Sequence, residues 1–106
     1  MYFEDYVLSI QYFNQVIKLK PYLAEPYLFR AIAKIQLEDY QGALRDCDAS
    51  IERNPFQPGA YYTRGFVYRQ LHDYDKAESD FTQALVFAPE NKTYLLLRAD
   101  TRAAKK

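Results

Sequence analysis

The hydrophobic and polar positions of this chain follow the three-to-four-residue spacing of amphipathic helices. One run begins near residue 24, and its face is formed by Tyr27, Arg30, Ala31 and Lys34. A second run follows the polar break at residues 37–39, with a face formed by Tyr40, Ala43, Leu44, Cys47, Ser50 and Ile51. Proline has no amide hydrogen and disfavours helical angles in the residue before it, so we expect this run to stop at Asn54, before Pro55. The pattern predicts two helices joined by a tight turn.

The same pattern returns at a fixed period along the chain. Three series of residues keep one common interval: Asp5, Asp39 and Asp73; Tyr6, Tyr40 and Tyr74; and Pro21, Pro55 and Pro89. We predict two complete units, 24–57 and 58–91, flanked by a second helix alone in residues 3–21 and a first helix alone in residues 92–106. Stacked helix pairs bury their apolar faces on one another. The sequence therefore predicts an all-α solenoid of six helices in antiparallel pairs, and its half units are typical of a piece of a longer protein.

Several positions are expected to hold the helices together. Asp39 and Asp73 directly precede second helices, where a short carboxylate can accept hydrogen bonds from free amides and oppose the helix dipole. Alanine or glycine at residues 31, 43, 65 and 77 would let the backbones approach closely. We expect six side chains to be buried between helices: Phe13, Tyr27, Ala43, Tyr61, Ala77 and Phe81.

Composition excludes some classes of protein. Among 106 residues, 14 basic side chains balance 14 acidic ones, so the basic excess of a nucleic-acid-binding protein is missing. The basic tail from Arg98 to Lys106 is interpreted as a solvated helix end. The sequence contains neither a visible signal peptide nor an apolar run of membrane-spanning length. We expect a soluble protein, cytoplasmic or periplasmic according to the sequence upstream.

The residues with potential chemistry form no catalytic arrangement. His72, the single histidine, falls in a predicted turn, and no serine or cysteine nucleophile stands at a recognisable spacing from it. Cys47 takes the core position that Phe13 and Phe81 hold in the other copies. The aspartates lack the spacing of an EF-hand loop, and three glycines do not make a phosphate-binding loop. We expect no enzymatic activity, no cofactor and no metal.

The repeated unit resembles the tetratricopeptide repeat, whose pattern of W-x2-L-G-x2-Y, then A-x3-F, then P extends over about 34 residues. The second unit has Tyr61-x2-Arg64-Gly65-x2-Tyr68, Ala77-x3-Phe81 and Pro89, and the first has the looser Tyr27-x2-Arg30-Ala31-x2-Lys34, Ala43-x3-Cys47 and Pro55. The resemblance covers essentially the whole chain. It implies a right-handed superhelical array of helix pairs.

Arginine replaces the leucine of this pattern three times, at Arg30, Arg64 and Arg98. Asp46 and Asp80 follow the first two arginines at one common spacing, which places each aspartate opposite its arginine in an antiparallel helix pair. One interpretation is a ladder that binds anions. We favour structural ion pairs, Arg30 with Asp46 and Arg64 with Asp80, because the two charges recur together and the guanidinium fork suits a carboxylate.

The resemblance also implies where function lies, because the first helices of tetratricopeptide proteins line a groove that binds extended or helical peptides. The groove residues are then Leu28, Phe29, Ile32, Ile35, Tyr62, Thr63, Phe66, Arg69, Gln70, Thr93, Leu96, Leu97 and Asp100. One subgroup of the family grips the C-terminal carboxylate of heat-shock chaperones with Lys and Asn. This chain has Leu28, Phe29, Ile32, Gly59 and Thr63 at those positions, so the resemblance does not extend to that activity. An apolar and aromatic groove instead indicates an interface, or packing on further helices of a longer chain.

The favoured hypothesis is a non-enzymatic scaffold that binds a protein or peptide partner through this groove. The alternative is a structural spacer of a larger solenoid, whose groove is filled by its own chain or by self-association. We also predict a homo-oligomer through the end helices, because residues 3–21 and 92–106 supply the two complementary halves of one unit.

Overall fold

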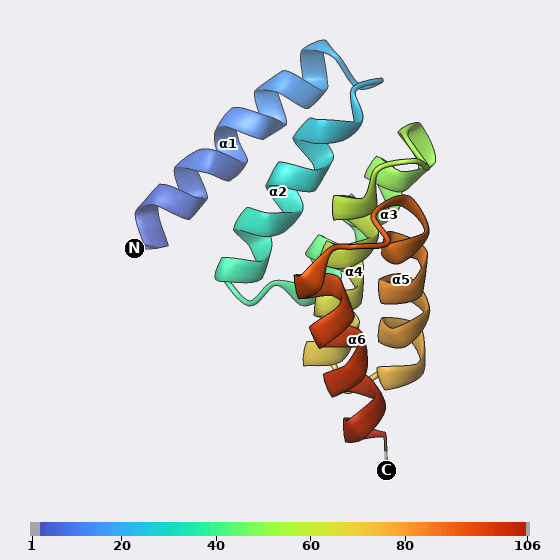
Figure 1. Cartoon of the computed structure of the whole chain (residues 1–106). Coiled ribbons are helices and arrows are strands. Elements are labelled where there is room, and N and C mark those ends of the chain that lie inside the picture. Colours follow the sequence, from blue (N-terminus) through green and yellow to red (C-terminus); the bar gives the residue numbers. More distant parts are fainter. Residues whose placement is uncertain (1–2, 106) are drawn as a thin grey trace. The chain divides into compact units, whose positions relative to one another are not determined.

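A computed structural model describes residues 3–105, and every regular element in this range is an α-helix (Figure 1). The helices are α1 (Phe3–Leu19), α2 (Ala24–Gln36), α3 (Tyr40–Arg53), α4 (Pro58–Gln70), α5 (Tyr74–Phe87) and α6 (Lys92–Ala104). The predicted all-α architecture of helix pairs is confirmed. Lys106, the last residue of the predicted half unit 92–106, lies outside the described residues.

Two compact units make up the chain, one ending at Pro55 and the other beginning at Phe56. In the first unit, α2 packs on both α1 and α3. In the second unit, α5 packs on both α4 and α6. In the first unit, therefore, the first helix of a repeat (α2) lies between two second helices (α1 and α3). In the second unit, the second helix of a repeat (α5) lies between two first helices (α4 and α6).

Two tight turns of the same kind connect α2 with α3 and α4 with α5. Glu38 and His72 adopt the left-handed region in these turns, with φ of 60° and 64°. The amides of Asp39 and Asp73 then donate to the carbonyls of Lys34 and Tyr68, at 2.8 and 2.9 Å, which satisfies carbonyls that the helix end would leave free. Each aspartate side chain accepts a hydrogen bond from the amide three positions later. Both predicted N-caps are confirmed.

The core is confirmed at five of the six expected positions, which are Tyr27, Ala43, Tyr61, Ala77 and Phe81. Phe13 is the exception, because it is only half-buried. The reason is packing: α1 packs on α2 alone, whereas α5, which carries Phe81, lies against helices on two sides. Phe13 is therefore only partly buried, on the one side where α2 covers it.

Gly65 lies where α4 packs closely against α5. A Cβ atom at this position would come within 2.9 Å of Cε1 of Phe81 and 3.1 Å of Cβ of Asp80. Phe81 is fully buried. The absence of a side chain at Gly65 thus lets the helix pair close over this phenylalanine.

Candidate binding faces of the first helices

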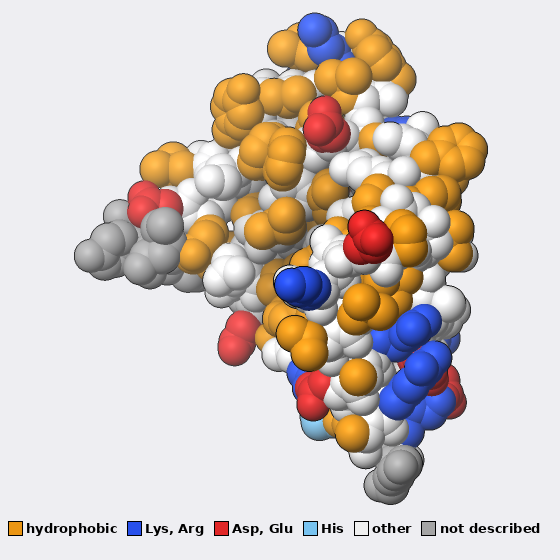
Figure 2. All heavy atoms as spheres, in the orientation of Figure 1, with side chains coloured by type: hydrophobic (Ala, Val, Ile, Leu, Met, Phe, Trp, Pro, Cys, Tyr) orange, Lys and Arg blue, Asp and Glu red, His pale blue; other side chains and the backbone are white. Residues whose placement is uncertain are grey.

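The first unit presents two large apolar side chains from α2. Phe29 and Ile32 are exposed, whereas Ile35 is half-buried and Leu28 is buried. Hydrophobic side chains are visible along α1 and α2 in Figure 2. Leu28 therefore offers little surface to a ligand, and Phe29 and Ile32 are the accessible members of the predicted set.

Aromatic rings from α1 extend this face. The ring centroids of Phe13 and Phe29 are 5.7 Å apart, and those of Tyr12 and Phe13 are 5.2 Å apart in an edge-to-face arrangement. Such contacts hold aromatic rings in a fixed orientation. The face therefore consists of an aromatic cluster continued by Ile32. Tyr12 and Phe13 were not predicted there, because the resemblance assigns the groove to first helices alone.

The second unit has an aromatic stack between α4 and α6. Tyr62 and Tyr94 stack with centroids 5.0 Å apart, and Tyr62 also contacts Phe81 at 6.2 Å. Partial burial, and to a lesser extent the neighbouring Tyr62, raises the pKa of Tyr94, so its phenol stays neutral at ordinary pH. Sequence reasoning missed Tyr94, because the residue in the same register of the preceding copy is Ala60, which gives no aromatic signal.

An ion pair joins the same two helices further along. A terminal nitrogen of Arg69 donates to a carboxylate oxygen of Asp100. The Nε atom of Arg69 is buried and has no hydrogen-bond partner among the described residues. Both residues were predicted separately as groove residues, and the structure brings them together.

The other predicted residues of the second unit differ in accessibility. Gln70, Thr93 and Leu96 are exposed, and Phe66 and Leu97 are half-buried. Thr63 is buried, and its hydroxyl donates to the carbonyl of Gly59 at 2.7 Å, so it serves the helix rather than a ligand. The accessible part of this unit is therefore the tyrosine stack, the exposed Leu96 and the ion pair of Arg69 with Asp100.

The structure also brings together the two arginine–aspartate pairs. Nε and Nη2 of Arg30 donate to the two carboxylate oxygens of Asp46 at 2.8 and 2.6 Å. Arg64 binds Asp80 in the same two-point manner, at 2.9 and 2.8 Å. Both aspartates are buried. The hydrogen bonds with Asp46 raise the pKa of Arg30 further above its already high value. These arginines are held inside helix pairs and do not line the accessible faces.

Arg30 has a further partner that sequence reasoning did not foresee. Its Nη1 donates to Oδ1 of Asn14 on α1 at 2.8 Å, so this arginine bridges the second helices on both of its sides. The third arginine, Arg98, has its Nη1 3.4 Å from the hydroxyl of Thr82 on α5. Asn14 precedes Arg30 by 16 residues, and Thr82 precedes Arg98 by the same number.

The basic end of the chain binds α5. Lys105 contacts Asp75 at 2.8 Å and Glu78 at 2.7 Å, and Arg102 also donates to Glu78. The hydrogen bond from Lys105, followed by that from Arg102, lowers the pKa of Glu78 to about 2. The interpretation of this tail as a solvated helix end was therefore incomplete, because its charges fasten α6 to α5.

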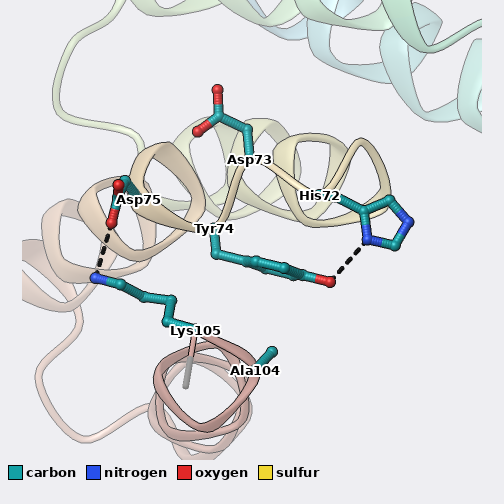
Figure 3. A pocket seen from close by; sticks show the side chains of 6 residues that line it. All are labelled: His72, Asp73, Tyr74, Asp75, Ala104 and Lys105. Atoms are coloured by element: carbon teal, nitrogen blue, oxygen red, sulfur yellow. Dashed lines mark hydrogen bonds and ion pairs between the residues drawn. The ribbon is translucent and has the colours of Figure 1, made fainter.

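His72 lies beside these charges at the rim of an open hollow of about 410 Å³ (Figure 3). Its Nδ1 atom lies 2.8 Å from the hydroxyl of Tyr74, and both residues are part of the turn into α5. Cys47 is buried in α3. Within the described residues, no group of three or more possible ligand residues is placed to hold a metal ion, and no helix is long and apolar enough to cross a membrane.

Paired helices, repeated turns and aspartate caps define a helical repeat protein. The sequence model of the tetratricopeptide repeat matches residues 58–91. The TPR domain of Arabidopsis OM64 has a similar structure, with a TM-score of 0.92 and 30% identity over 95% of this chain and 84% of that domain. The chain therefore belongs to the tetratricopeptide-repeat family.

Other relatives agree with this assignment. The SGT1 homologue of Oryza sativa subsp. japonica is 31% identical over 104 residues, which are 96% of this chain and 28% of that protein. The first TPR of Spaghetti (RPAP3) shares the fold with a TM-score of 0.92 and 23% identity, covering 95% of this chain and 80% of that structure. The chain spans 10–28% of the length of the curated relatives that it matches.

Proposed function

We propose that this chain is a non-enzymatic interaction module that binds an apolar peptide or helix through the accessible faces of its first helices. The observation that carries the proposal is the recurrence of large exposed apolar side chains on these helices, Phe29 and Ile32 on α2 and Leu96 on α6. Single exposed apolar residues are common on soluble proteins, but grouped ones usually mark interfaces. Aromatic and aliphatic anchors also supply most of the binding energy at protein interfaces.

The tyrosine stack and the ion pair in the second unit support the same function. The stack of Tyr62 on Tyr94 is a rigid apolar contact between α4 and α6, and Leu96 is exposed on α6. The pair of Arg69 with Asp100 adds one donor group and one acceptor group between the same two helices. A site with an apolar surface and a few placed polar groups fixes the orientation of a ligand. We propose that the ion pair orients the bound peptide.

The chemistry of the ligand is proposed to be apolar rather than acidic. The structure of the first TPR of Spaghetti holds an HSP90 peptide, SRMEEVD, which is acidic towards its C-terminus. At the positions that grip such a carboxylate in the family, this chain has Leu28, Phe29, Ile32, Gly59 and Thr63, none of which carries a positive charge. At these five positions an acidic peptide would lose its hydration without gaining an ion pair.

Fluorescence anisotropy with two labelled peptides tests this proposal. One peptide is an amphipathic helix with leucine and phenylalanine on one face, and the other is SRMEEVD. We expect the apolar peptide to bind more tightly, and Phe29→Asp and Leu96→Asp each to weaken it by about tenfold or more. Val86→Asp, at an exposed apolar position on α5, is the matched control and should leave affinity unchanged. Tighter binding of SRMEEVD, or indifference to both groove variants, would contradict the proposal.

A structural segment that associates with itself is the second candidate function. The observation that favours it is the exposure of Leu19 on α1, which belongs neither to the predicted groove residues nor to the aromatic cluster of Tyr12, Phe13 and Phe29. A spacer of this kind would bind neither peptide, and its mass in solution would depend on concentration. The two candidates are therefore separable by combining the anisotropy titration with a measurement of mass.

A further inference from the structure

The ion pair of Arg69 with Asp100 leaves most of its hydrogen-bonding capacity unused. In the pair of Arg64 with Asp80, two guanidinium nitrogens bind both carboxylate oxygens. Arg69 instead donates to Asp100 through Nη2 alone, and only Oδ2 of Asp100 accepts. Within the described residues, neither side chain has another hydrogen-bond partner, and Nε of Arg69 is buried without one. Free donors of an arginine and a free acceptor of a carboxylate therefore lie side by side.

Both members of this pair can be reached by a ligand. The side chain of Arg69 is 28% exposed and that of Asp100 is 57% exposed. The carboxylates of Asp46 and Asp80, in the other two arginine–aspartate pairs, are only 4% and 7% exposed. The pair of Arg69 with Asp100 is thus open to solvent on its carboxylate side, whereas the other two pairs are closed.

The exposure of Asp100 does not come from its place near the end of the sequence. Ile32 stands in the same register on α2, and α2 packs on second helices on both of its sides. Ile32 is nevertheless 42% exposed, although its neighbour Ala31 is fully buried. Second helices on both sides therefore cover the register of Ala31 and leave the register of Ile32 and Asp100 open.

Apolar side chains share the helix faces of the ion pair. On α6, Leu96 stands four residues before Asp100, so the two side chains lie on one face about a turn apart. Leu96 is 70% exposed. On α4, the half-buried Phe66 stands three residues before Arg69, which is also the spacing of neighbours on a helix. A ligand that covers Leu96 therefore also reaches the ion pair.

We propose that the ion pair selects a peptide that carries a carboxamide, the side chain of glutamine or asparagine, beside its apolar anchors. The proposal rests on the peptide-binding function proposed above. The carboxamide oxygen accepts from Arg69 while the NH2 group of the same carboxamide donates to Asp100. One neutral side chain of the ligand thus uses the free donors and the free acceptor together.

Charge complementarity is what commits the site to a neutral group. The charges of Arg69 and Asp100 cancel, so a carboxylate of the ligand would be attracted by the first and repelled by the second, and an ammonium group the reverse. An apolar side chain would take both charges out of water without replacing their hydrogen bonds to it. The backbone of a helical ligand already uses its own donors and acceptors, whereas a carboxamide reaches the pair from a helical or an extended peptide.

A set of matched peptides tests this selection by fluorescence anisotropy. The probe is the amphipathic helix described above, with glutamine placed in turn at each position that flanks its apolar face. At each position the analogues carry methionine, glutamate or lysine, and methionine keeps the length without the amide. We expect one glutamine peptide to bind about tenfold more tightly than its methionine analogue, and the glutamate and lysine analogues to bind no more tightly than methionine.

Two outcomes of this scan contradict different proposals. Equal binding of the glutamine and methionine peptides at every position would overturn the selection of a carboxamide and leave the peptide-binding function standing. Absence of binding by every peptide would overturn both proposals.

Two substitutions should change the order of the peptides. Asp100→Asn, at an exposed position, leaves the charge of Arg69, so the glutamate peptide should become the tightest. Arg69→Gln leaves the charge of Asp100, so the lysine peptide should become the tightest. Glu90→Gln removes an exposed carboxylate before α6 and is the matched control, which should keep the preference for glutamine. A purely structural ion pair would weaken all peptides together, so an unchanged order in Asp100→Asn would overturn the proposal.

Discussion

Arg30 and Arg64 replace a leucine of the family pattern with a charged group inside a helix pair. Each charge is accepted by a buried aspartate through two hydrogen bonds. Taking charges out of water is costly, and the two-point geometry offsets that cost only while both partners are present. The arginines therefore tie the two helices of a pair together in one register.

A double-mutant cycle on Arg64 and Asp80 measures this dependence. Asp80→Ala leaves a half-buried guanidinium without its carboxylate, so we expect it to lower the free energy of unfolding by about 2–4 kcal/mol. Arg64→Leu restores the family residue, and adding it to Asp80→Ala should recover part of the loss. Urea titration gives the three values. Additive effects of the two substitutions would contradict an energetic coupling between them.

Gly65 provides a second test of the close packing at the same position. Replacing glycine by alanine inside a helix usually stabilises it by about 1 kcal/mol. Here the new methyl group would overlap the ring of the fully buried Phe81, so we expect Gly65→Ala to destabilise by about 1–3 kcal/mol. Thermal unfolding measures the sign. A rise in Tm would show that Phe81 can move aside.

The six helices could be predicted because their signals are local and repeat at a fixed period. Aspartates before α3 and α5 mark the starts of these helices. Pro55 follows Asn54, the C-cap residue of α3, and so marks the end of this helix at Arg53. The ion pairs followed from charges that recur at one spacing in two successive copies. Each of these signals lies within one repeat, where helix geometry alone determines which side chains meet.

Contacts that depend on neighbouring repeats were less predictable. Tyr94 has no aromatic counterpart at Ala60, so its stack with Tyr62 left no periodic signal. The pairing of Arg69 with Asp100 depends on how α4 and α6 are rotated, which spacing does not determine. Side-chain burial at Leu28 and Thr63 likewise depends on tertiary packing. Part of the candidate site could therefore be recognised only in the structure.

We expect the attachment of α6 to α5 to weaken at acidic pH. The pKa of Glu78 falls from 4.5 to about 2 because Lys105 and Arg102 stabilise its charged form. A carboxyl whose pKa is lower in the folded state than in the unfolded state stabilises the folded state when the pH is above the unfolded-state pKa. This contribution is therefore complete above about pH 4.5 and is lost as the pH falls through about 2.

An NMR titration of the Glu78 carboxyl group checks this prediction together with the amide signals of α6. We expect the carboxyl to titrate near pH 2, with α6 signals changing in the same range. Glu78→Gln is the matched control and should remove that transition while leaving the signals of α4 unchanged. A carboxyl midpoint near pH 4.5 would show that the contacts with Lys105 and Arg102 do not persist in solution.

The chain combines packed repeat cores with exposed apolar side chains on its first helices. Phe29 and Ile32 on α2 and Leu96 on α6 are exposed. Of the second helices, α5 buries Ala77, Phe81, Ala84 and Leu85, and α3 buries Ala43 and Cys47. Binding through the first helices is thus the central proposal.

The most direct test is an NMR titration of the labelled chain with the unlabelled apolar peptide. Binding through the first helices predicts that the signals of Phe29, Ile32, Tyr62 and Leu96 shift together and saturate, while those of exposed residues on α5, such as Val86, stay in place. Saturating shifts centred on α3 and α5, or no shifts at millimolar peptide, would contradict the account.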